Sequence, residues 1–369
     1  MNVAIVGVGL IGGSIGIAAR ERLGARVRGF DARSDVVEEA LAMGAIDAGA
    51  ERLAAAVEDA AVAFVATPIA AVPGVVQQVL AAAPPDCVVS DVGSTKQAIL
   101  QATNDQRFVG GHPLAGGEGA GVGLARADMF EGATWYLTPA GHTSGVLYER
   151  LHRLLAALGA RPAAIDAAAH DRLMACVSHL PHVLANVLVG QASDTVGALG
   201  EESPAGPRDV RAVFAGGAPG PSFRDATRVA GANSSIWTDI YLSNREELIP
   251  CLTGAIEALG AVRDMLDDGE AEPLRRWNER ARSDRDRLAR PESAGEEAHE
   301  LRVMVPNRPG VIAEIALALG RAGVNISDMA LSPSPDGSRG VVALWVRGPG
   351  QAADAQELVA ALGFQVVAR

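Results

Sequence analysis

The chain has 369 residues, 49% of them hydrophobic, which is enough apolar sequence to build two or three domains with buried cores. Its formal net charge of −12 argues against a nucleic-acid partner, because phosphate binding needs a basic surface. No charge-free run approaches the roughly eighteen apolar residues of a membrane span, so we expect no membrane contact and a cytoplasmic protein.

The N-terminal part alternates strands with helices. An apolar strand at 2–6 precedes a glycine-rich turn and a helix that ends near Arg20. Further β-type runs are Val27–Phe30, Val62–Ala66, Val88–Asp91, Phe108–Gly110 and Trp135–Leu137. This order predicts an α/β domain over residues 1–165 with a doubly wound parallel sheet, the Rossmann arrangement.

The rest of the chain divides into two units. Strand patterns disappear after Asp166, so residues 166–290 are predicted to form an all-helical domain. The charged segment Ser283–Glu300 contains proline and glycine and is typical of an exposed connection. Residues 299–369 then show the order βαββαβ, with elements at Leu301–Val305, Pro309–Ala322, Asn325–Leu331, Gly340–Val346, Ala352–Leu362 and Gln365–Ala368.

The first turn carries a dinucleotide-binding fingerprint. Glycines at 7, 9 and 12 permit a tight turn, close approach of a pyrophosphate and helix packing, and Asp31 ends the next strand. Its carboxylate suits ribose hydroxyls and repels a 2′-phosphate, which favours NAD over NADP, although Arg33 weakens that preference. The alternative is that the glycines serve only a turn. The expected cofactor-binding residues are Gly7, Gly9, Leu10, Ile11, Gly12, Asp31, Thr67 and Pro68.

Three histidines stand in unusual settings. His112 follows a sheet strand directly, where a ring of near-neutral pKa can take a proton from an alcohol as hydride leaves. His179 and His182 form a His-x-x-His pair that favours substrate contact; the alternatives are a metal site, for which the sequence supplies no further ligands, or helix packing. Three cysteines lie far apart, so we expect no disulfide and no zinc site but buried packing residues: Cys87, Cys176 and Cys251.

An acidic and a basic residue lie three positions apart in the helical region. On one helix face, the Asp225 carboxylate can orient the Arg228 guanidinium to bind a substrate carboxylate. The alternative is a solvated ion pair without function.

Five motifs in this order resemble the prephenate dehydrogenase family over about the first 290 residues. They are Gly7-Val8-Gly9-Leu10-Ile11-Gly12-Gly13-Ser14, Asp91-Val92-Gly93-Ser94-Thr95-Lys96, Gly111-His112-Pro113-Leu114-Ala115-Gly116, Ser178-His179-Leu180-Pro181-His182 and Phe223-Arg224-Asp225-Ala226-Thr227-Arg228. The resemblance implies hydride transfer from a cyclohexadienol to NAD with loss of carbon dioxide. It also implies that His112 takes the hydroxyl proton, that Ser94 hydrogen-bonds the hydroxyl and orients His112, and that Arg228 binds a substrate carboxylate with Asp225 behind it.

The resemblance carries further implications for the substrate pocket. His179 and His182 complete it, Trp237 reaches toward the partner subunit's site, and the helical domain forms a homodimer. Gly117 departs from the family, which often has a hydroxyl residue there. Glu118 suits the ammonium of arogenate or repels the side chain of prephenate, so the choice between prephenate and arogenate stays open.

The C-terminal unit resembles an ACT domain, a family that binds amino acids. Its expected effector-binding residues are Asn307, Pro309, Gly310 and Asn325, with backbone amides at the helix start facing a ligand carboxylate. Tyrosine, the pathway product, is the expected effector. The alternative is a purely structural, dimerising role.

Three other functions compete with this interpretation. A β-hydroxyacid dehydrogenase normally uses a lysine in its helical domain, and none occurs there. A catalytically silent amino-acid sensor would keep the fold, but His112, Ser94 and Arg228 are intact. A relative that acts on an amino-substituted prephenate is the third.

Overall fold

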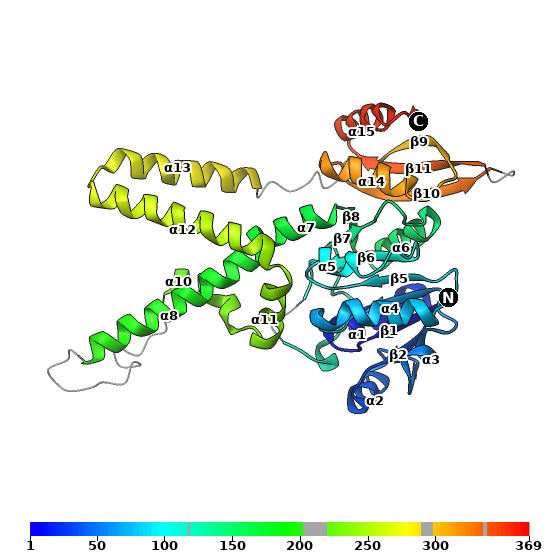
Figure 1. The fold of residues 1–369 in the computed structure, drawn as a ribbon, viewed down its shortest axis with the longest axis horizontal. Helices are drawn as coiled ribbons and strands as arrows, with labels where there is room; N and C mark the ends of the chain where they lie inside the picture. The colour runs from blue at the N-terminus through cyan, green and yellow to red at the C-terminus, as the bar shows by residue number, and fades with distance from the viewer. Residues whose placement is uncertain (117–118, 202–219, 289–297, 335–337, 369) are drawn as a thin grey trace.

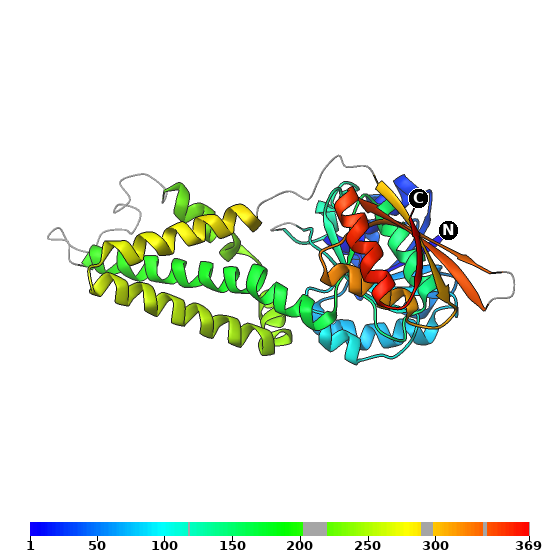
Figure 2. The ribbon, with the colours of Figure 1, turned by 90° about the horizontal axis from the view of Figure 1, so that it is seen from above.

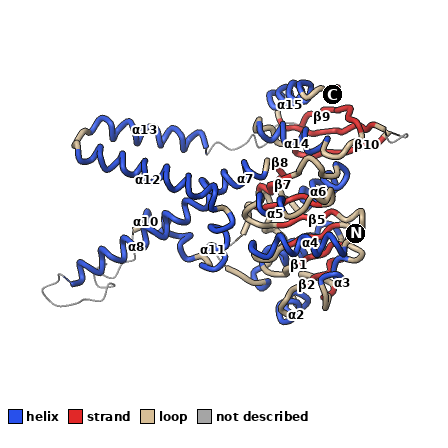
Figure 3. Tube along the Cα trace, in the orientation of Figure 1, coloured by secondary structure: helices blue, strands red, loops and turns tan. Residues whose placement is uncertain are grey.

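The computed structural model describes residues 1–116, 119–201, 220–288, 298–334 and 338–368. A sheet domain at the N-terminus carries the C-terminal domain on one side, and the helical domain projects away from both (Figures 1 and 2). Within the described residues, strands occur in the N-terminal and C-terminal domains, and the projecting domain is helical (Figure 3). The expected fold class, a Rossmann domain, a helical domain and a βαββαβ domain, is confirmed.

The N-terminal sheet has eight strands in the order β3-β2-β1-β4-β5-β6-β7-β8. Their bounds are β1 Asn2–Val6, β2 Arg26–Phe30, β3 Ala48–Gly49, β4 Val62–Val65, β5 Val88–Asp91, β6 Phe108–Pro113, β7 Thr134–Thr138 and β8 Arg161–Ala164. Strands β1, β4 and β5 are almost wholly buried, as expected where helices cover both faces of a parallel sheet.

The helices of this domain are α1 Leu10–Leu23, α2 Ser34–Ala42, α3 Leu53–Val57, α4 Val72–Ala82, α5 Gln97–Gln101 and α6 Gly145–Ala157. The sheet departs from the sequence-based expectation in two ways. Strand β7 pairs antiparallel with β6, and the described part of the connection, residues 114–116 and 119–133, contains a 3-10 turn but no crossover helix of the kind that joins parallel strands. Strands β3 and β8 are additional: β3 has two residues, and β8 contains Pro162, which is unfavourable for a strand interior.

The helical domain consists of α7 Ala167–Met174, α8 Leu180–Glu201, α10 Pro221–Thr227, α11 Ser234–Ser243, α12 Arg245–Asp267 and α13 Ala271–Leu288. The Asp166 side chain caps α7 by accepting from two backbone amides of its first turn. Helix α13 continues to Leu288, so residues 283–288, expected as part of an exposed connection, are helical.

One helical run in this domain, residues 167–195, is apolar and long enough to cross a membrane by length and composition alone. Only 28% of its most apolar window is buried within the single chain. Large apolar side chains are also exposed along α8 and α12, among them Val187, Leu188, Ile256 and Leu259. A contiguous apolar surface of this kind marks an interaction face.

The C-terminal domain is an antiparallel sheet, in the order β10-β11-β9-β12, with two helices. Its elements are β9 Ala298–Pro306, α14 Val311–Arg321, β10 Ile326–Pro333, β11 Arg339–Arg347, α15 Pro349–Ala361 and β12 Gln365–Ala368. The helix α14 buries one apolar face, which includes Ile312, Ile315 and Leu319.

The C-terminal domain packs closely on the N-terminal one through α14 and β10 against α6 and β8 (Figure 1). The two domains share one apolar core, in which Leu151 of α6 and Ile315 of α14 both take part. At Gly310, whose φ is +81°, a Cβ atom would lie 2.0 Å from the Gly141 carbonyl oxygen. The contact therefore requires glycine, and the domain is held against its neighbour by backbone approach as well as by apolar packing.

Candidate active site

The glycine-rich loop has the geometry that a bound pyrophosphate needs. Gly7 has a φ of +95°, and a Cβ on Gly12 would lie 2.0 Å from the Gly7 carbonyl oxygen. A Cβ on Gly9, in contrast, would meet nothing within 4 Å, and Gly9 is the N-cap of α1. Backbone atoms pack tightly at Gly7 and Gly12, whereas the space beside Gly9 is free. A phosphate can approach there and meet the backbone amides at the N-terminus of the helix.

Asp31 lies at the end of β2, beside this loop. Its Oδ2 accepts a hydrogen bond of 3.1 Å from the Val8 amide, and its Oδ1 accepts one from the Arg33 amide. Arg33 pairs with Asp35, so its guanidinium is engaged by a neighbouring carboxylate. Just after β4, the Thr67 hydroxyl is buried and has no hydrogen-bond partner among the described residues. The loop, the carboxylate and this hydroxyl fit a dinucleotide with a free ribose hydroxyl pair.

His112 lies near the carboxyl end of β6, directly across from Tyr136 on β7. Its Nδ1 lies 2.9 Å from Nε2 of His170 on α7, and Nδ1 of His170 lies 2.8 Å from Oδ1 of Asp171. Burial lowers the pKa of His112 well below 6.5, and the nearby His170, Lys96 and His179 lower it further. The ring is therefore neutral at physiological pH and is a proton acceptor.

The same contacts determine which nitrogen of His112 acts as the base. Burial lowers the pKa of His170 as well, so His170 is neutral and its Nδ1–H donates to Asp171. Its Nε2 is then an acceptor, and His112 Nδ1–H donates to it. His112 is left with a lone pair on Nε2. His170 is a positioning residue that the sequence gave no reason to select, because it pairs with His112 from 58 residues away.

A buried ion pair supports the strand that carries His112. Lys96, the only lysine in the sequence, is fully buried; its Nζ donates to Asp91 Oδ2 and to the Gly111 carbonyl oxygen. Asp91 also accepts from the amides of Gly93 at 2.8 Å and Gly111 at 3.1 Å. The pair thus joins the ends of β5 and β6 one residue before His112. Sequence reasoning did not predict this ion pair, although the chain's single lysine, Lys96, could have drawn attention to it.

His179 and His182 are both buried, and each uses Nδ1 within the helical domain. His179 Nδ1 lies 3.0 Å from the Asn244 amide, and His182 Nδ1 pairs with the Tyr241 hydroxyl. Burial lowers the pKa of His179 to about 4. Burial lowers the pKa of His182 as well, and a hydrogen bond with the Val229 backbone opposes that shift.

Trp237 stacks on His182 of its own chain, with ring centroids 3.6 Å apart and an interplanar angle of 8°. It also makes an edge contact with His179 at 6.2 Å. Within the single chain, Trp237 thus contacts both histidines of the His-x-x-His pair. Its expected reach toward the partner subunit's site stays a prediction.

Two expected substrate-binding residues lie on neighbouring elements. Helix α10 ends at Thr227, and Arg228 begins a 3-10 turn, so Asp225 and Arg228 do not share one helix. Both side chains are exposed. The turn packs against α8, which carries His182. Glu118 and Gly117 lie outside the described residues.

Ser94 follows β5 and is partly exposed. The resemblance assigned it to orient His112, but within the described part of the chain the side-chain hydrogen bond of His112 is made with His170, which therefore takes the orienting position. The contact of Ser94 with the substrate hydroxyl stays a prediction.

The three cysteines were expected to be buried packing residues, and only one of them is buried. Cys87 is buried, and burial raises its pKa to about 12. Cys176 is exposed and Cys251 partly so, and their sulfur atoms lie 3.0 Å apart. Cys176 lies between α7 and α8, and Cys251 lies on α12. The two residues are far apart in sequence, so the sequence alone did not predict this contact.

The four residues expected to bind an effector are divided by the structure. Asn307 and Pro309 line a cavity of about 200 Å³ between the N- and C-terminal domains. Asn325 lines a different one, of about 290 Å³, at the same interface. The Gly310 amide donates to the Thr143 carbonyl oxygen at 3.0 Å and is used for docking.

Comparison with protein families identifies three matching regions. Residues 15–163 match the model described as prephenate dehydrogenase, nucleotide-binding domain; residues 166–279 match prephenate dehydrogenase, dimerization domain; and residues 299–360 match the ACT domain. The curated prephenate dehydrogenase of Bacillus subtilis (strain 168) is 30% identical over 351 residues, which cover 92% of this chain and 91% of the relative.

Solved structures give the same picture. A structure of prephenate dehydrogenase from Aquifex aeolicus in complex with hydroxyphenyl propionate and NAD+ superposes with a TM-score of 0.68 at 27% identity, over 78% of this chain and 98% of that one. Synechocystis arogenate dehydrogenase superposes with a TM-score of 0.65 at 27% identity, over 78% and 100% of the two chains.

Proposed function

The chain belongs to the prephenate dehydrogenase family and is an NAD-dependent dehydrogenase, and from this premise we propose that it converts prephenate to 4-hydroxyphenylpyruvate in tyrosine biosynthesis. The observation that carries the proposal is the neutral His112, whose Nε2 lone pair is fixed by His170 and Asp171 at the end of β6.

The proposed reaction assigns each electron pair. NAD held by the glycine loop and Asp31 would supply the acceptor for the hydride, which leaves the ring carbon that bears the hydroxyl group. The hydroxyl proton passes to Nε2 of His112, and Ser94 hydrogen-bonds the hydroxyl oxygen. The bond from the opposite ring carbon to its carboxylate breaks, carbon dioxide leaves, and the freed pair completes the aromatic ring. The ring oxygen then takes the proton back from His112, which gives the phenol of the product and restores the neutral base. The chain's own contribution is to hold a neutral base and to place it against the hydroxyl.

The substrate's negative charges need partners in the helical domain. We propose that Arg228 binds a substrate carboxylate, with Asp225 nearby, and that His179, His182 and Trp237 form the remaining wall. The support is the stacking of Trp237 on the buried His182, which lies on the helix against which the Arg228 turn packs. A guanidinium such as that of Arg228 binds a carboxylate through charge-assisted hydrogen bonds.

Arogenate is the second candidate substrate, favoured by the similarity to Synechocystis arogenate dehydrogenase and by the acidic residue Glu118. The experiment that separates the candidates incubates the purified protein with prephenate or arogenate and with NAD or NADP, and follows reduced cofactor. Preferred turnover of prephenate with NAD is the expected result. Preferred turnover of arogenate would replace the proposal by the second candidate, and no turnover by protein that binds NAD would support the sensor alternative.

Replacing Asp31 by alanine is expected to lower kcat/KM with NAD by roughly 10- to 100-fold, because hydrogen bonds from the ribose to a charged group are lost. The ratio of NADP to NAD turnover should rise, since the charge that repels a 2′-phosphate is removed. Steady-state kinetics with both cofactors measure this. Glu38→Ala, on the exposed side of α2, is the matched control and should leave the ratio unchanged. An unaltered ratio in the Asp31 variant would refute the assigned contact.

The low pKa of His112 predicts the acid limb of the pH profile. A base whose pKa is lowered loses activity only when the pH falls through that lowered value, so kcat/KM should stay on its plateau as the pH falls to 6.5 and should decline only at more acidic pH. Measurement of kcat/KM at saturating NAD across the acid range tests this. A limb that is half-complete at or above 6.5 would contradict the buried, His170-paired state.

We propose that the working form is a homodimer built through the helical domain. The match to a dimerization domain and the exposed apolar side chains of α8 and α12 support it. The same pairing would cover the apolar run 167–195, which gives that run a role without a membrane, and we place the enzyme in the cytoplasm. We also propose tyrosine as the effector of the ACT domain.

A further inference from the structure

Asn244 joins α11 to α12 and is almost fully buried, with 3% of its surface exposed. It is the N-cap of α12, but its side chain makes no capping hydrogen bond to that helix. Asparagine is among the preferred residues at this position because its side-chain oxygen accepts from backbone amides of the first turn. The side chain of Asn244 forgoes that contact and is used outside α12.

The Asn244 amide group contacts two other elements. Its Nδ2 lies 2.8 Å from the Asp171 backbone carbonyl oxygen and 3.0 Å from Nδ1 of His179. A carbonyl oxygen accepts hydrogen bonds and cannot donate them, so the Asn244 atom that faces it must be the nitrogen. The amide group therefore has one orientation, and the second hydrogen of Nδ2 is donated to His179.

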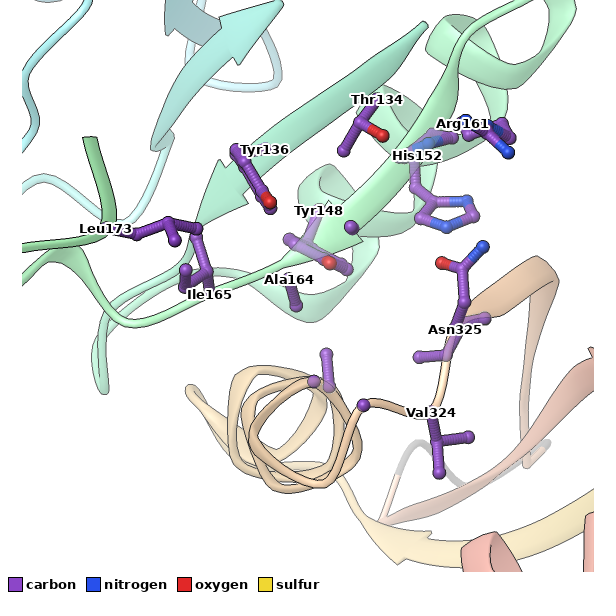
Figure 4. Close-up of a pocket in the computed structure, with 16 residues that line it drawn as sticks. Thr134, Tyr136, Tyr148, His152, Arg161, Ala164, Ile165, Leu173, Val324 and Asn325 are labelled. Carbon is purple, nitrogen blue, oxygen red and sulfur yellow. The ribbon is translucent and has the colours of Figure 1, made fainter. Parts of the chain in front are cut away.

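The Asp171 carbonyl is a fixed partner, because α7 is anchored on two sides. The Asp171 carboxylate accepts from the backbone amides of Lys96 at 2.7 Å and of Gln97 at 2.9 Å, at the start of α5. Two residues further along α7, Leu173 lies at the interface with the C-terminal domain (Figure 4). The orientation of the Asn244 amide group is thus set by a backbone atom that is itself held in place.

The same contact decides which nitrogen of His179 carries the proton. Burial lowers the pKa of His179 to about 4, so the ring holds a single proton at neutral pH. Its Nδ1 accepts from Asn244, so that proton is on Nε2. We propose that Asn244 is a positioning residue for substrate binding: it keeps His179 in the form that donates from Nε2, and this N–H group binds an oxygen atom of the substrate.

The proposal gives two histidines of the site opposite tautomers. His112 donates from Nδ1 and has a lone pair on Nε2, whereas His179 accepts at Nδ1 and donates from Nε2. The two rings lie close enough for His179 to act on His112 electrostatically. One neutral ring can then take the substrate proton while the other binds a substrate oxygen. A lone pair on Nε2 of His179 would instead repel that oxygen and weaken binding.

The charge state of His179 depends on the titratable groups around it. The groups that interact with the ring electrostatically are Asp171 and His170 on α7, His182 on α8 and His112 on β6. The Asp171 carboxylate favours the protonated ring and the histidines oppose it, but burial is the largest effect. The amide group of Asn244 adds no charge, so the ring stays neutral. A carboxylate in its place would favour a proton on Nδ1 and reverse the tautomer.

This inference rests on the proposed function for the identity of the substrate, but the tautomer of His179 can be measured without substrate. The test replaces Asn244 by aspartate, which has nearly the same shape but places an acceptor at Nδ1. Nitrogen NMR of the full chain, isotope-labelled in its histidines, reports the protonation of each ring nitrogen, and His179→Gln identifies the signals. Asn233→Asp is the matched control, because the exposed Asn233 side chain accepts hydrogen bonds at the N-cap of α11 and aspartate does the same.

We expect the wild-type chain and Asn233→Asp to carry the His179 proton on Nε2. Asn244→Asp should carry it on Nδ1 and should raise the pKa of His179. Above that raised pKa, measured in the same variant, KM for the substrate should rise by about tenfold, the effect of one lost hydrogen bond, while kcat changes by less than about threefold. Below that pKa the doubly protonated ring donates from Nε2 again, so KM should fall back toward the wild-type value.

A double variant separates positioning from general stability. If Asn244 acts through His179, Asn244→Asp should change KM by less than about twofold in the His179→Ala background. A full effect there, an unchanged tautomer in Asn244→Asp, or a wild-type His179 with its proton on Nδ1 would overturn the proposal. A wild-type chain that carries the proton on Nε2 but does not turn over prephenate would contradict the proposed function and leave the tautomer assignment standing.

Discussion

Replacing His112 by asparagine is expected to lower kcat by roughly 10²- to 10⁴-fold, the usual contribution of a positioned general base. Asparagine keeps a hydrogen-bond donor toward His170 but has no basic lone pair for the substrate proton. Affinity for NAD should be unchanged, because the expected cofactor contacts come from the glycine loop after β1 and from Asp31 after β2, which the substitution leaves intact.

The measurement is steady-state turnover together with NAD titration in the same preparation. His299→Asn, on β9 of the C-terminal domain, is the matched control and should keep full turnover. A His112 variant within about threefold of the wild-type kcat would show that another group removes the proton, since a lost base costs far more.

Replacing Lys96 by methionine is expected to destabilise the fold by about 3–5 kcal/mol, because it leaves the Asp91 carboxylate buried without its cation. Methionine has nearly the length of lysine, so the loss is electrostatic rather than a cavity. The Gly111 carbonyl also loses its donor one residue before His112, and kcat should fall in the protein that stays folded. Denaturant unfolding followed by circular dichroism measures the change.

A second substitution separates charge from packing. In the double variant Lys96→Met with Asp91→Asn the carboxylate that paired with Lys96 is removed together with the ammonium, and at least half of the lost stability should return. If Lys96→Met unfolds at the wild-type denaturant concentration, the ion pair contributes nothing to stability and the support of β6 must come from other contacts.

The sequence predicted the local parts of this protein well. The glycine loop and the βαββαβ order depend on residues that are neighbours in the chain, and both appear in the structure. The antiparallel placement of β7 was missed, because β-type runs look alike in either direction. Its consequence is functional, since it brings Tyr136 opposite His112.

Sequence reasoning also missed the residues that support the base His112. His170 and Asp171 act on His112 and on the start of α5 across long sequence separations, so no spacing pattern revealed them. The effector residues show the converse: Asn307 and Asn325 flank one helix in sequence, yet they line different cavities once the C-terminal domain docks. Docking depends on surface shape, which periodicity does not encode.

The most direct test of the proposed chemistry is the stoichiometry of one reaction, in which NADH and carbon dioxide are measured together from a known amount of prephenate. Because the hydride and the carboxylate leave the same ring in one aromatisation, the proposal predicts one NADH and one carbon dioxide per prephenate consumed, with 4-hydroxyphenylpyruvate as product. NADH without carbon dioxide, or carbon dioxide without NADH, would contradict the proposal and require a different reaction at His112.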